Sequence, residues 1–242
     1  MKLIIDIGNT LVKVGLFEKK QLLITKTSPI LSLDFITSIT DQNKNISSVI
    51  ISSVKDVSVD IINYLKKNFR FIELSALTVI PITNLYKTPE TLGKDRLAGI
   101  VAAHSLYPDE NVLVIDAGTC ITYDIITAKG EYYGGNISPG LNMRFKALHT
   151  FTEKLPLVSL INFTELIGTD TNKSILSGVI NGIVAEADAI IERYRDFYSP
   201  LKIIICGGDA QFLVDRLKKN SIFAVSELVL IGLNEILDYN EL

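Results

Sequence analysis

The sequence predicts an α/β protein made of two similar domains, each with a mixed sheet flanked by helices. Three observations support this prediction. A short Asp–Gly motif occurs twice, as DIGNT at residues 6–10 and as DAGT at residues 116–119. Each copy follows an apolar run typical of a buried strand, and a second extended run leaves each copy. In both halves a third extended segment and then alternating helical and extended patterns follow, which indicates a duplicated unit.

The first half of the chain is predicted to open with strands joined by short links, which favour antiparallel pairing. Runs rich in Ile and Val predict further strands, and apolar residues at helical spacing predict helices between them. The predicted strands span residues 2–8, 11–17, 21–26, 48–54 and 69–74. The predicted helices span residues 33–39, 57–67 and 97–106. Pro108 and a charge cluster then mark a boundary, which gives predicted domains 1–109 and 110–242.

The second half repeats this order. Its predicted strands span residues 112–115, 120–126, 132–137 and 203–206. Its predicted helices run from Pro139 to about Leu148, over residues 174–195 and over residues 211–218. In the longest of these helices, Gly178 and Gly182 lie four residues apart and permit close approach of another helix. That approach is either an internal contact or the seam of a dimer.

Composition limits the classes of function. Apolar residues make up 48% of the 242 residues, enough for a substantial core, and the net charge is −3. Because no basic stripe is present, nucleic-acid binding is not expected. We recognise no signal peptide and no apolar run that approaches the length of a membrane span, so a cytoplasmic protein without membrane contact is predicted. Cys120 and Cys206 lie in apolar strand-like segments, which fits a reducing compartment.

The two Asp–Gly turns predict phosphate chemistry. A turn of this kind presents backbone N–H groups and a Thr hydroxyl to a phosphate, and its Asp can hold a metal ion or a metal-bound water. Two such turns facing each other would clamp a nucleoside triphosphate between two lobes, which points to a duplicated-domain kinase. An isolated Asp6 would more often be a simple turn cap, and Lys13 is either a phosphate contact or a solvated strand residue. The second copy at Asp116 favours the functional interpretation.

Further segments offer chemistry, each with a simpler alternative. Asp95 could accept a proton from a substrate hydroxyl and Arg96 could bind a carboxylate, or the two are a helix cap and a surface residue. Glycines at residues 134–140 and 207–208 let a backbone approach a ligand closely, or they form plain tight turns. The two histidines have no partner at metal spacing and no GxxxxGK[ST] loop is present, which argues against a zinc site and a P-loop kinase.

Taken together, these segments resemble the type III pantothenate kinases, and the resemblance covers nearly the whole chain. The first turn through Lys13 and the second turn through Thr122 are similar to the two phosphate motifs of that family. Tyr86 followed by GKDR at residues 93–96 is similar to its pantothenate segment, although Lys94 stands where a small residue is common. Further similar blocks lie at residues 134–141, 147–149, 155–156, 168–171 and 177–178. Each motif alone is weak, but their order and spacing are specific.

The resemblance implies two duplicated ribonuclease-H-like domains of the actin-like ATPase superfamily. It implies ATP-dependent phosphorylation of pantothenate to 4′-phosphopantothenate, the first step of coenzyme A biosynthesis. By resemblance Asp95 is the catalytic proton acceptor, and Asp116 binds a monovalent cation, K⁺ or NH₄⁺, beside the Mg²⁺ that ATP requires. Thr171 would reach the substrate from the neighbouring subunit of a homodimer. The implied ATP-binding residues are Asp6, Ile7, Gly8, Asn9, Thr10, Leu11, Val12, Lys13 and Thr119. The implied pantothenate-binding residues are Tyr86, Gly93, Lys94, Asp95, Arg96 and Thr171.

Three alternatives remain open on the sequence. A sugar kinase of the same superfamily would share both phosphate turns, but the segment from Tyr86 to Arg96 argues against it. A non-catalytic relative acting as a transcriptional activator is suggested when the acidic residues are lost, and Asp6, Asp95 and Asp116 are all present. An actin-like or chaperone ATPase needs inserted subdomains, for which 242 residues leave no room.

Overall fold

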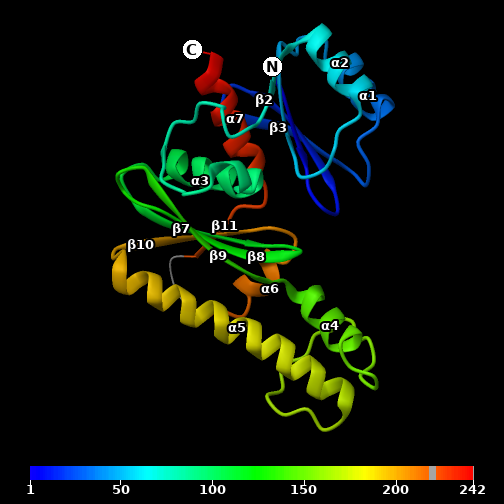
Figure 1. The fold of residues 1–242 in the computed structure, drawn as a ribbon, viewed down its shortest axis with the longest axis vertical. Helices are drawn as coiled ribbons and strands as arrows, with labels where there is room; N and C mark the ends of the chain where they lie inside the picture. Colours follow the sequence, from blue (N-terminus) through cyan, green and yellow to red (C-terminus); the bar gives the residue numbers. More distant parts are fainter. Residues whose placement is uncertain (218–221, 242) are drawn as a thin grey trace. The chain divides into compact units, whose positions relative to one another are not determined.

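The structure is a computed structural model in which residues 1–217 and 222–241 are described (Figure 1). Contacts divide the chain into two compact units, which we describe separately. Unit 1 comprises Met1–Asp109, Ala128–Tyr133 and Glu227–Leu242, and unit 2 comprises Glu110–Thr127 and Gly134–Ser226. The predicted domains 1–109 and 110–242 differ from these units, because unit 1 also takes in two later segments of the chain.

Unit 1 contains a five-stranded sheet in the order β3-β2-β1-β4-β5. Its strands are β1 (Lys2–Ile7), β2 (Val12–Glu18), β3 (Gln21–Ser28), β4 (Ser48–Ser53) and β5 (Arg70–Glu73). The first three strands pair antiparallel, which confirms the prediction drawn from their short links. Strands β4 and β5 join in parallel, because a helix before each of them returns the chain to the same end of the sheet.

Helices cover both faces of this sheet (Figure 1). They are α1 (Leu33–Gln42), α2 (Val59–Asn68), α3 (Lys94–Leu106) and α7 (Leu228–Glu241). Leu3 and Ile5 of β1 face α1 and α2, whereas Ile4 faces α3 and α7, as the period of two in a strand requires. Helices α3 and α7 cross closely, since a Cβ atom on Gly232 would lie 1.8 Å from the carbonyl oxygen of Ala98.

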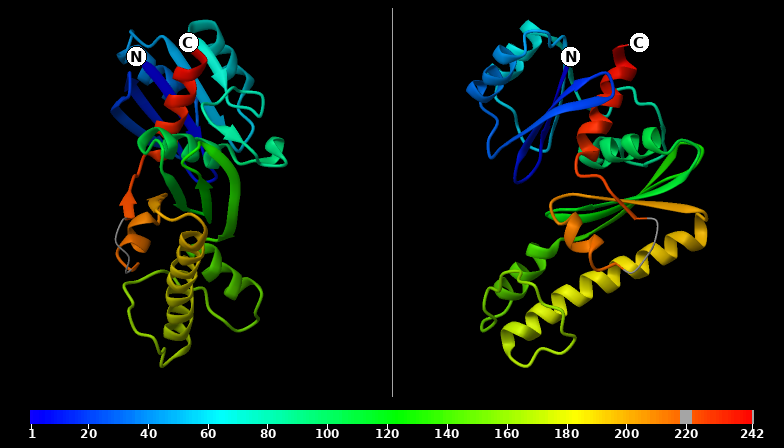
Figure 2. Two further views of the ribbon diagram at one scale, coloured as in Figure 1. Left: turned by 90° about the vertical axis from the view of Figure 1, so that its left-hand side faces the viewer. Right: turned by 180° about the vertical axis from the view of Figure 1, so that it is seen from behind.

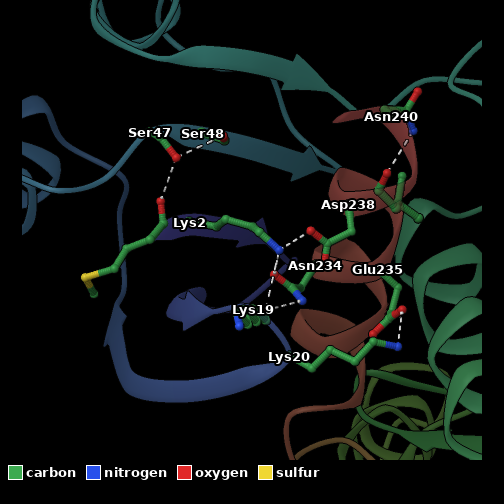
Figure 3. A network of polar contacts seen from close by, with 11 residues as sticks. Lys2, Lys19, Lys20, Ser47, Ser48, Asn234, Glu235, Asp238 and Asn240 are labelled. Atoms are coloured by element: carbon green, nitrogen blue, oxygen red, sulfur yellow. Dashed lines mark hydrogen bonds and ion pairs between the residues drawn. The ribbon is translucent and has the colours of Figure 1, made fainter. Parts of the chain in front are cut away.

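Polar contacts tie α7 to the opening hairpin (Figure 3). The Lys2 ammonium donates to Asp238 and, at 3.4 Å, to Oδ1 of Asn234. Lys20 pairs with Glu235 at 3.1 Å. Together with the apolar contacts of α7, these pairs explain why the last helix clusters with the first strands rather than with the segment before it. The sequence analysis predicted no helix there.

The second sheet has the order β11-β10-β7-β8-β9-β6. Its strands are β6 (Thr83–Asn84), β7 (Asn111–Ala117), β8 (Cys120–Ile126), β9 (Glu131–Pro139), β10 (Leu201–Cys206) and β11 (Ile222–Ala224). Strands β7 and β8 form an antiparallel pair around the second Asp–Gly turn, and β10 pairs with β7 in parallel. This repeats the β1, β2 and β4 arrangement around the first turn.

The helices of unit 2 lie beside this sheet (Figure 2). They are α4 (Leu141–Thr150), α5 (Thr171–Phe197) and α6 (Ala210–Val214). By length and composition α5 could cross a membrane, contrary to the expectation that no apolar run is long enough. Ile180, Ile183 and Ile191 of α5 nevertheless lie in the hydrophobic core of unit 2 against the sheet, which is the ordinary position of a core helix.

The predicted elements differ from the structure at several ends. The sequence predicts that Pro139 begins a helix, but Pro139 ends β9, and Gly140 is the cap of α4. The predicted helix 211–218 is the short helix α6, and Lys218 lies outside the described residues. Strands β6 and β11 are absent from the prediction, because runs of two or three residues carry no periodicity.

Candidate active site

The first Asp–Gly turn lies in unit 1, between β1 and β2. The Gly8 amide donates to the carbonyl oxygen of Leu11 at 3.0 Å, which closes the turn. Asn9 and Thr10 at its tip are exposed, and Asp6 is partly buried at the end of β1. The turn therefore leaves backbone and hydroxyl groups open to a ligand, with a carboxylate at its base.

The residues at this turn continue as a polar row across three strands. Asp6 is in register with Lys13 on β2 and with Ser52 on β4, so the three side chains project from one face of the sheet. Lys13 also pairs with Glu227, just before α7, at 3.6 Å. Lys13 is thus held in a charged environment beside the turn, rather than being only a solvated strand residue. Glu227 and Ser52 were missed by the sequence analysis.

The start of α3 presents the predicted catalytic carboxylate. Gly93 occupies the cap position, and the Asp95 side chain instead accepts a hydrogen bond from the Arg96 amide at 2.8 Å. A Cβ atom on Gly93 would lie 2.6 Å from Oδ1 of Asp95, so a larger residue there would displace this carboxylate. The interpretation of Asp95 as the helix cap is therefore wrong. One carboxylate oxygen is fixed by the helix amide and the side chain remains partly accessible.

Arg96 is not the surface residue of the simpler interpretation, since only 9% of it is exposed. Its guanidinium lies 5.7 Å from the centre of the Tyr86 ring. Tyr86 in turn stacks on Tyr132, with ring centres 6.2 Å apart and planes inclined by 10°. The result is a layered arrangement of one cation and two aromatic rings, in which the fully buried Tyr132 supports two predicted substrate-binding residues.

An open pocket of about 730 Å³ in unit 1 adjoins the first turn and the start of α3. Its lining consists of Ser53, Val54, Lys55, Asp56, Val57, Ile62, Glu73 and Lys94. Lys55 donates to the carbonyl oxygen of Asn9 at 2.7 Å, so the segment that follows β4 is joined to the first turn. The sequence motifs identify Lys94 but not Lys55. The signal was available, because Lys55 directly follows the predicted buried strand 48–54.

The second Asp–Gly turn lies in unit 2 and is braced by two glycine segments. The Gly140 amide, at the start of α4, donates to the carbonyl oxygen of Thr119 at 3.1 Å. A Cβ atom on Gly140 would lie 2.2 Å from the carbonyl oxygen of Gly118. The Asp209 amide donates to the carbonyl oxygen of Ala117 at 2.8 Å. Thr119 itself is exposed and Asp116 is partly buried.

Gly207 touches the predicted cation ligand. Its φ is +92°, and a Cβ atom there would lie 2.4 Å from Oδ1 of Asp116 and from the carbonyl oxygen of Ala117. The Gly–Gly segment after β10 is thus a tight turn that also lets the backbone approach Asp116. Nearby, burial raises the pKa of Asp209 above its usual value.

The glycine-rich loop at residues 134–140 serves the sheet more than a ligand. A Cβ atom on Gly135 would lie 1.7 Å from the Tyr123 carbonyl oxygen, so the simpler interpretation holds at that position. Beyond the loop, Arg144 donates to the carbonyl oxygen of Pro139 at 2.9 Å and pairs with Glu186 at 2.7 Å, which fixes the start of α4. Burial, and then the negative charge of Glu186, raise the pKa of Tyr123 although Arg144 opposes the shift.

Thr171 is the exposed first residue of α5, and it lines an open, mostly apolar pocket of about 720 Å³ within unit 2. The other lining residues are Arg144, Ala147, Leu148, Leu155, Ser174, Ile175, Gly178 and Val179. A Cβ atom on Gly178 or Gly182 would meet no described atom within 4 Å. Within the described residues these glycines therefore make no internal helix contact, and their face of α5 is open.

Each unit therefore groups its own predicted residues. In unit 1 Lys13 lies beside the first turn, Arg96 lies over Tyr86, and Lys94 lines the same pocket as Lys55, which contacts the first turn. In unit 2 the structure brings Asp116 and Thr119 together, with Thr171 on a different element. Within residues 1–217 and 222–241, no three His, Cys, Asp or Glu side chains form a metal-binding group.

Comparison with known proteins gives the same assignment as the motifs. The family model described as type III pantothenate kinase matches residues 2–193. A type III pantothenate kinase from Christiangramia forsetii is 47% identical over 244 residues, covering 100% of this chain and 99% of that protein. One from Phocaeicola vulgatus is also 47% identical, over 242 residues, with 100% and 99% covered.

Solved structures show which folds the chain is similar to. A ROK family glucokinase from Streptomyces griseus, crystallised with glucose and AMPPNP, has a TM-score of 0.56 at 12% identity and 98% coverage of both chains. A putative Baf family transcriptional activator from Campylobacter jejuni has a TM-score of 0.61 at 24% identity, covering 99% of this chain and 98% of that one. Both similarities concern the fold alone, and they confirm the predicted fold of two mixed α/β sheet domains, which resembles that of the ROK family kinase. The matches across the whole sequence decide the family: this chain belongs to the type III pantothenate kinases.

Proposed function

We propose that this protein transfers the γ-phosphoryl group of ATP to the primary hydroxyl of pantothenate with Asp95 as general base. The observation that carries the assignment is the Asp95 carboxylate at the start of α3, fixed through Arg96 N–H and still partly accessible. One carboxylate oxygen accepts the hydroxyl proton, the hydroxyl oxygen bonds to the γ-phosphorus, and the bond to the β-phosphate oxygen breaks to release ADP. Catalysis of this kind depends mainly on positioning and charge stabilisation.

Pantothenate carries a carboxylate, and the cationic groups beside Asp95 suit it. Arg96 offers a planar donor pair whose orientation is supported by Tyr86 and Tyr132. Lys94 lines the polar pocket of unit 1 and adds a second positive charge. We therefore assign Tyr86 and residues 93–96 to the pantothenate site, as the sequence predicted. A neutral sugar carries no carboxylate for these cationic groups to bind.

For the nucleotide, we assign residues 6–13 of the first turn and Thr119 of the second turn to the phosphates of ATP. A Mg²⁺ ion bound with ATP would neutralise phosphate charge, and Asp6 would hold it through water. The residues fit such an ion, because the buried hydroxyl of Ser52 beside Asp6 has no hydrogen-bond partner in the described part of the chain. Asp116 would bind the monovalent cation. The absence of a side chain at Gly207 leaves room for the Asp116 carboxylate in this position. No disulfide joins Cys120 and Cys206, which supports a cytoplasmic location.

The test is phosphorylation of pantothenate by the purified protein with ATP and Mg²⁺, with K⁺ or Na⁺ at equal ionic strength. We expect 4′-phosphopantothenate to form with K⁺ and to fall at least about tenfold with Na⁺, since the smaller Na⁺ ion would fit the cation site proposed at Asp116 less well. Glucose and N-acetylmannosamine serve as alternative acceptors. Phosphorylation of a sugar in preference to pantothenate, or of neither acceptor with K⁺ present, would contradict the proposal.

We further propose a homodimer in which α5 and the segments around it form the interface. Phe151, Leu166 and Ile167, which lie between α4 and α5, are 85%, 77% and 74% exposed, an unusual exposure for large apolar residues. The glycines of α5 leave its surface open to another helix. In such a dimer Thr171 would complete the pantothenate site of the partner, and its pocket would be covered.

Mixing two inactive variants tests whether sites are shared. Asp95→Asn removes the base, and Thr171→Glu places a negative charge where the pantothenate carboxylate would bind. If each site takes Asp95 from one chain and Thr171 from the other, a mixed dimer has one intact site. Unfolding and refolding the two variants together at equal amounts should then restore about one quarter of wild-type activity. Recovery no higher than the sum of the separate variants, or a monomer by light scattering, would count against the shared site.

A further inference from the structure

The polar row at the base of the first turn contains one group that the proposed mechanism does not use. Ser52 on β4 is 1% exposed, and its Oγ atom has no hydrogen-bond partner among the described residues. A buried hydroxyl without a partner is unfavourable by itself, and native structures contain few of them. An unpaired polar group of this kind points to a ligand or an ordered water that is bound when the protein acts.

The register of the sheet identifies what this hydroxyl faces. Ser52 is paired with Asp6 across the parallel strands β4 and β1, and neighbouring strands lie about 4.8 Å apart. Both side chains project from the face that carries α3 and α7, the same face as Ile4 and Ile50. Ser52 therefore stands directly beside the carboxylate assigned to the metal–ATP complex, at a distance suited to a shared water.

The surrounding charges support the same conclusion. Lys13 occupies the next position in the row on β2, and its ammonium lies 3.6 Å from Oε2 of Glu227. That oxygen is also buried and has no hydrogen-bond partner among the described residues. Ser52 Oγ and Glu227 Oε2 thus both lack a hydrogen-bond partner among the described residues, although Glu227 is ion-paired with Lys13. Hydrated divalent cations are commonly oriented by such outer oxygen groups.

We propose that Ser52 is a positioning residue for the Mg²⁺ of bound ATP, through a hydrogen bond to a water in the hydration shell of the ion at Asp6. Glu227 holds Lys13 at the edge of the same shell. The inference rests on the proposed function only in requiring Mg²⁺–ATP at the first turn. It adds two residues, neither of which belongs to the phosphate motif, to the group that orients the metal complex.

The test compares Ser52→Ala with Ser48→Ala. Ser48 lies on the same strand and the same face and is 2% exposed, but its hydroxyl has a partner in Ser47. Calorimetry measures the affinity for ATP with Mg²⁺ and, separately, with EDTA. We expect Ser52→Ala to weaken binding of Mg²⁺–ATP by about tenfold and to leave binding of metal-free ATP unchanged. Ser48→Ala should change neither affinity.

Thermal unfolding of the ligand-free proteins gives a second readout, in which Ser52→Ala should show no loss. Because the Ser52 hydroxyl has no partner, its removal should leave the melting temperature unchanged or raise it. Equal Mg²⁺–ATP affinities for wild type and Ser52→Ala, or an equal loss with and without Mg²⁺, would overturn the inference. If Ser52→Ala weakens the binding of Mg²⁺–ATP but the wild-type protein does not phosphorylate pantothenate, the result supports this inference and contradicts the proposed function. The two can therefore fail separately.

Discussion

Replacing Asp95 with Asn is expected to reduce the turnover number for pantothenate phosphorylation by about 10³-fold, because a positioned general base contributes roughly 10²–10⁴-fold. The side-chain carbonyl of the introduced asparagine can still accept the hydrogen bond that the Arg96 amide donates at 2.8 Å, so the start of α3 should keep its geometry. The affinity for ATP should change little, since the predicted phosphate contacts lie on other elements. Steady-state kinetics with a coupled ADP assay measures the first effect, and calorimetry measures the second.

Asp56→Asn is the matched control for this prediction. Asp56 lines the polar pocket of unit 1 together with Lys94, the neighbour of Asp95, and it is exposed and has no role in the proposed mechanism. It should retain turnover within about twofold, as expected for a surface substitution. Near-normal turnover of Asp95→Asn would remove Asp95 as the base. Comparable losses in both variants would show that the total negative charge in this region matters instead of one proton acceptor.

The strands around both turns could be predicted because apolar runs with β-branched residues end at an Asp–Gly turn in each half. Strand β4, for example, is an Ile- and Val-rich segment that is buried along nearly its whole length. The last helix was harder to predict. Leu228, Leu230, Leu233, Ile236 and Leu237 of α7 are all buried, so that helix is apolar around much of its circumference and lacks a single apolar stripe.

Site residues contributed by the motifs were recognisable, whereas those brought in by folding were not. Asp6, Asp95 and Asp116 each lie in a short pattern with its own turn chemistry. Ser52 and Glu227 lie far from the first turn in sequence, and only strand register and the packing of α7 bring them near it. The burial of Arg96 likewise depends on tertiary contacts, and spacing at a helix start favoured a surface position instead.

The second large effect is expected at Gly207, where Ala should destabilise the protein and weaken its response to K⁺. A residue with a Cβ atom at φ of +92° is strained by about 1–2 kcal/mol. The added atom would also lie 2.4 Å from the Ala117 carbonyl oxygen, and relief of such overpacking typically costs about 1–3 kcal/mol. We therefore expect the free energy of unfolding to fall by about 2–5 kcal/mol, measured by urea denaturation.

The same Cβ atom would lie 2.4 Å from Oδ1 of Asp116, so the carboxylate must move if Asp116 is the cation ligand. At a temperature where the Gly207→Ala protein is folded, the K⁺ concentration for half-maximal activity should rise about tenfold or more, as expected when a ligand is displaced. Gly208→Ala is the control, because a Cβ atom there meets no described atom within 4 Å. It should match the wild type in K⁺ response and stability. If Gly207→Ala were destabilised but kept a normal K⁺ response, the tight turn would be structural only and the cation would have to bind away from Asp116.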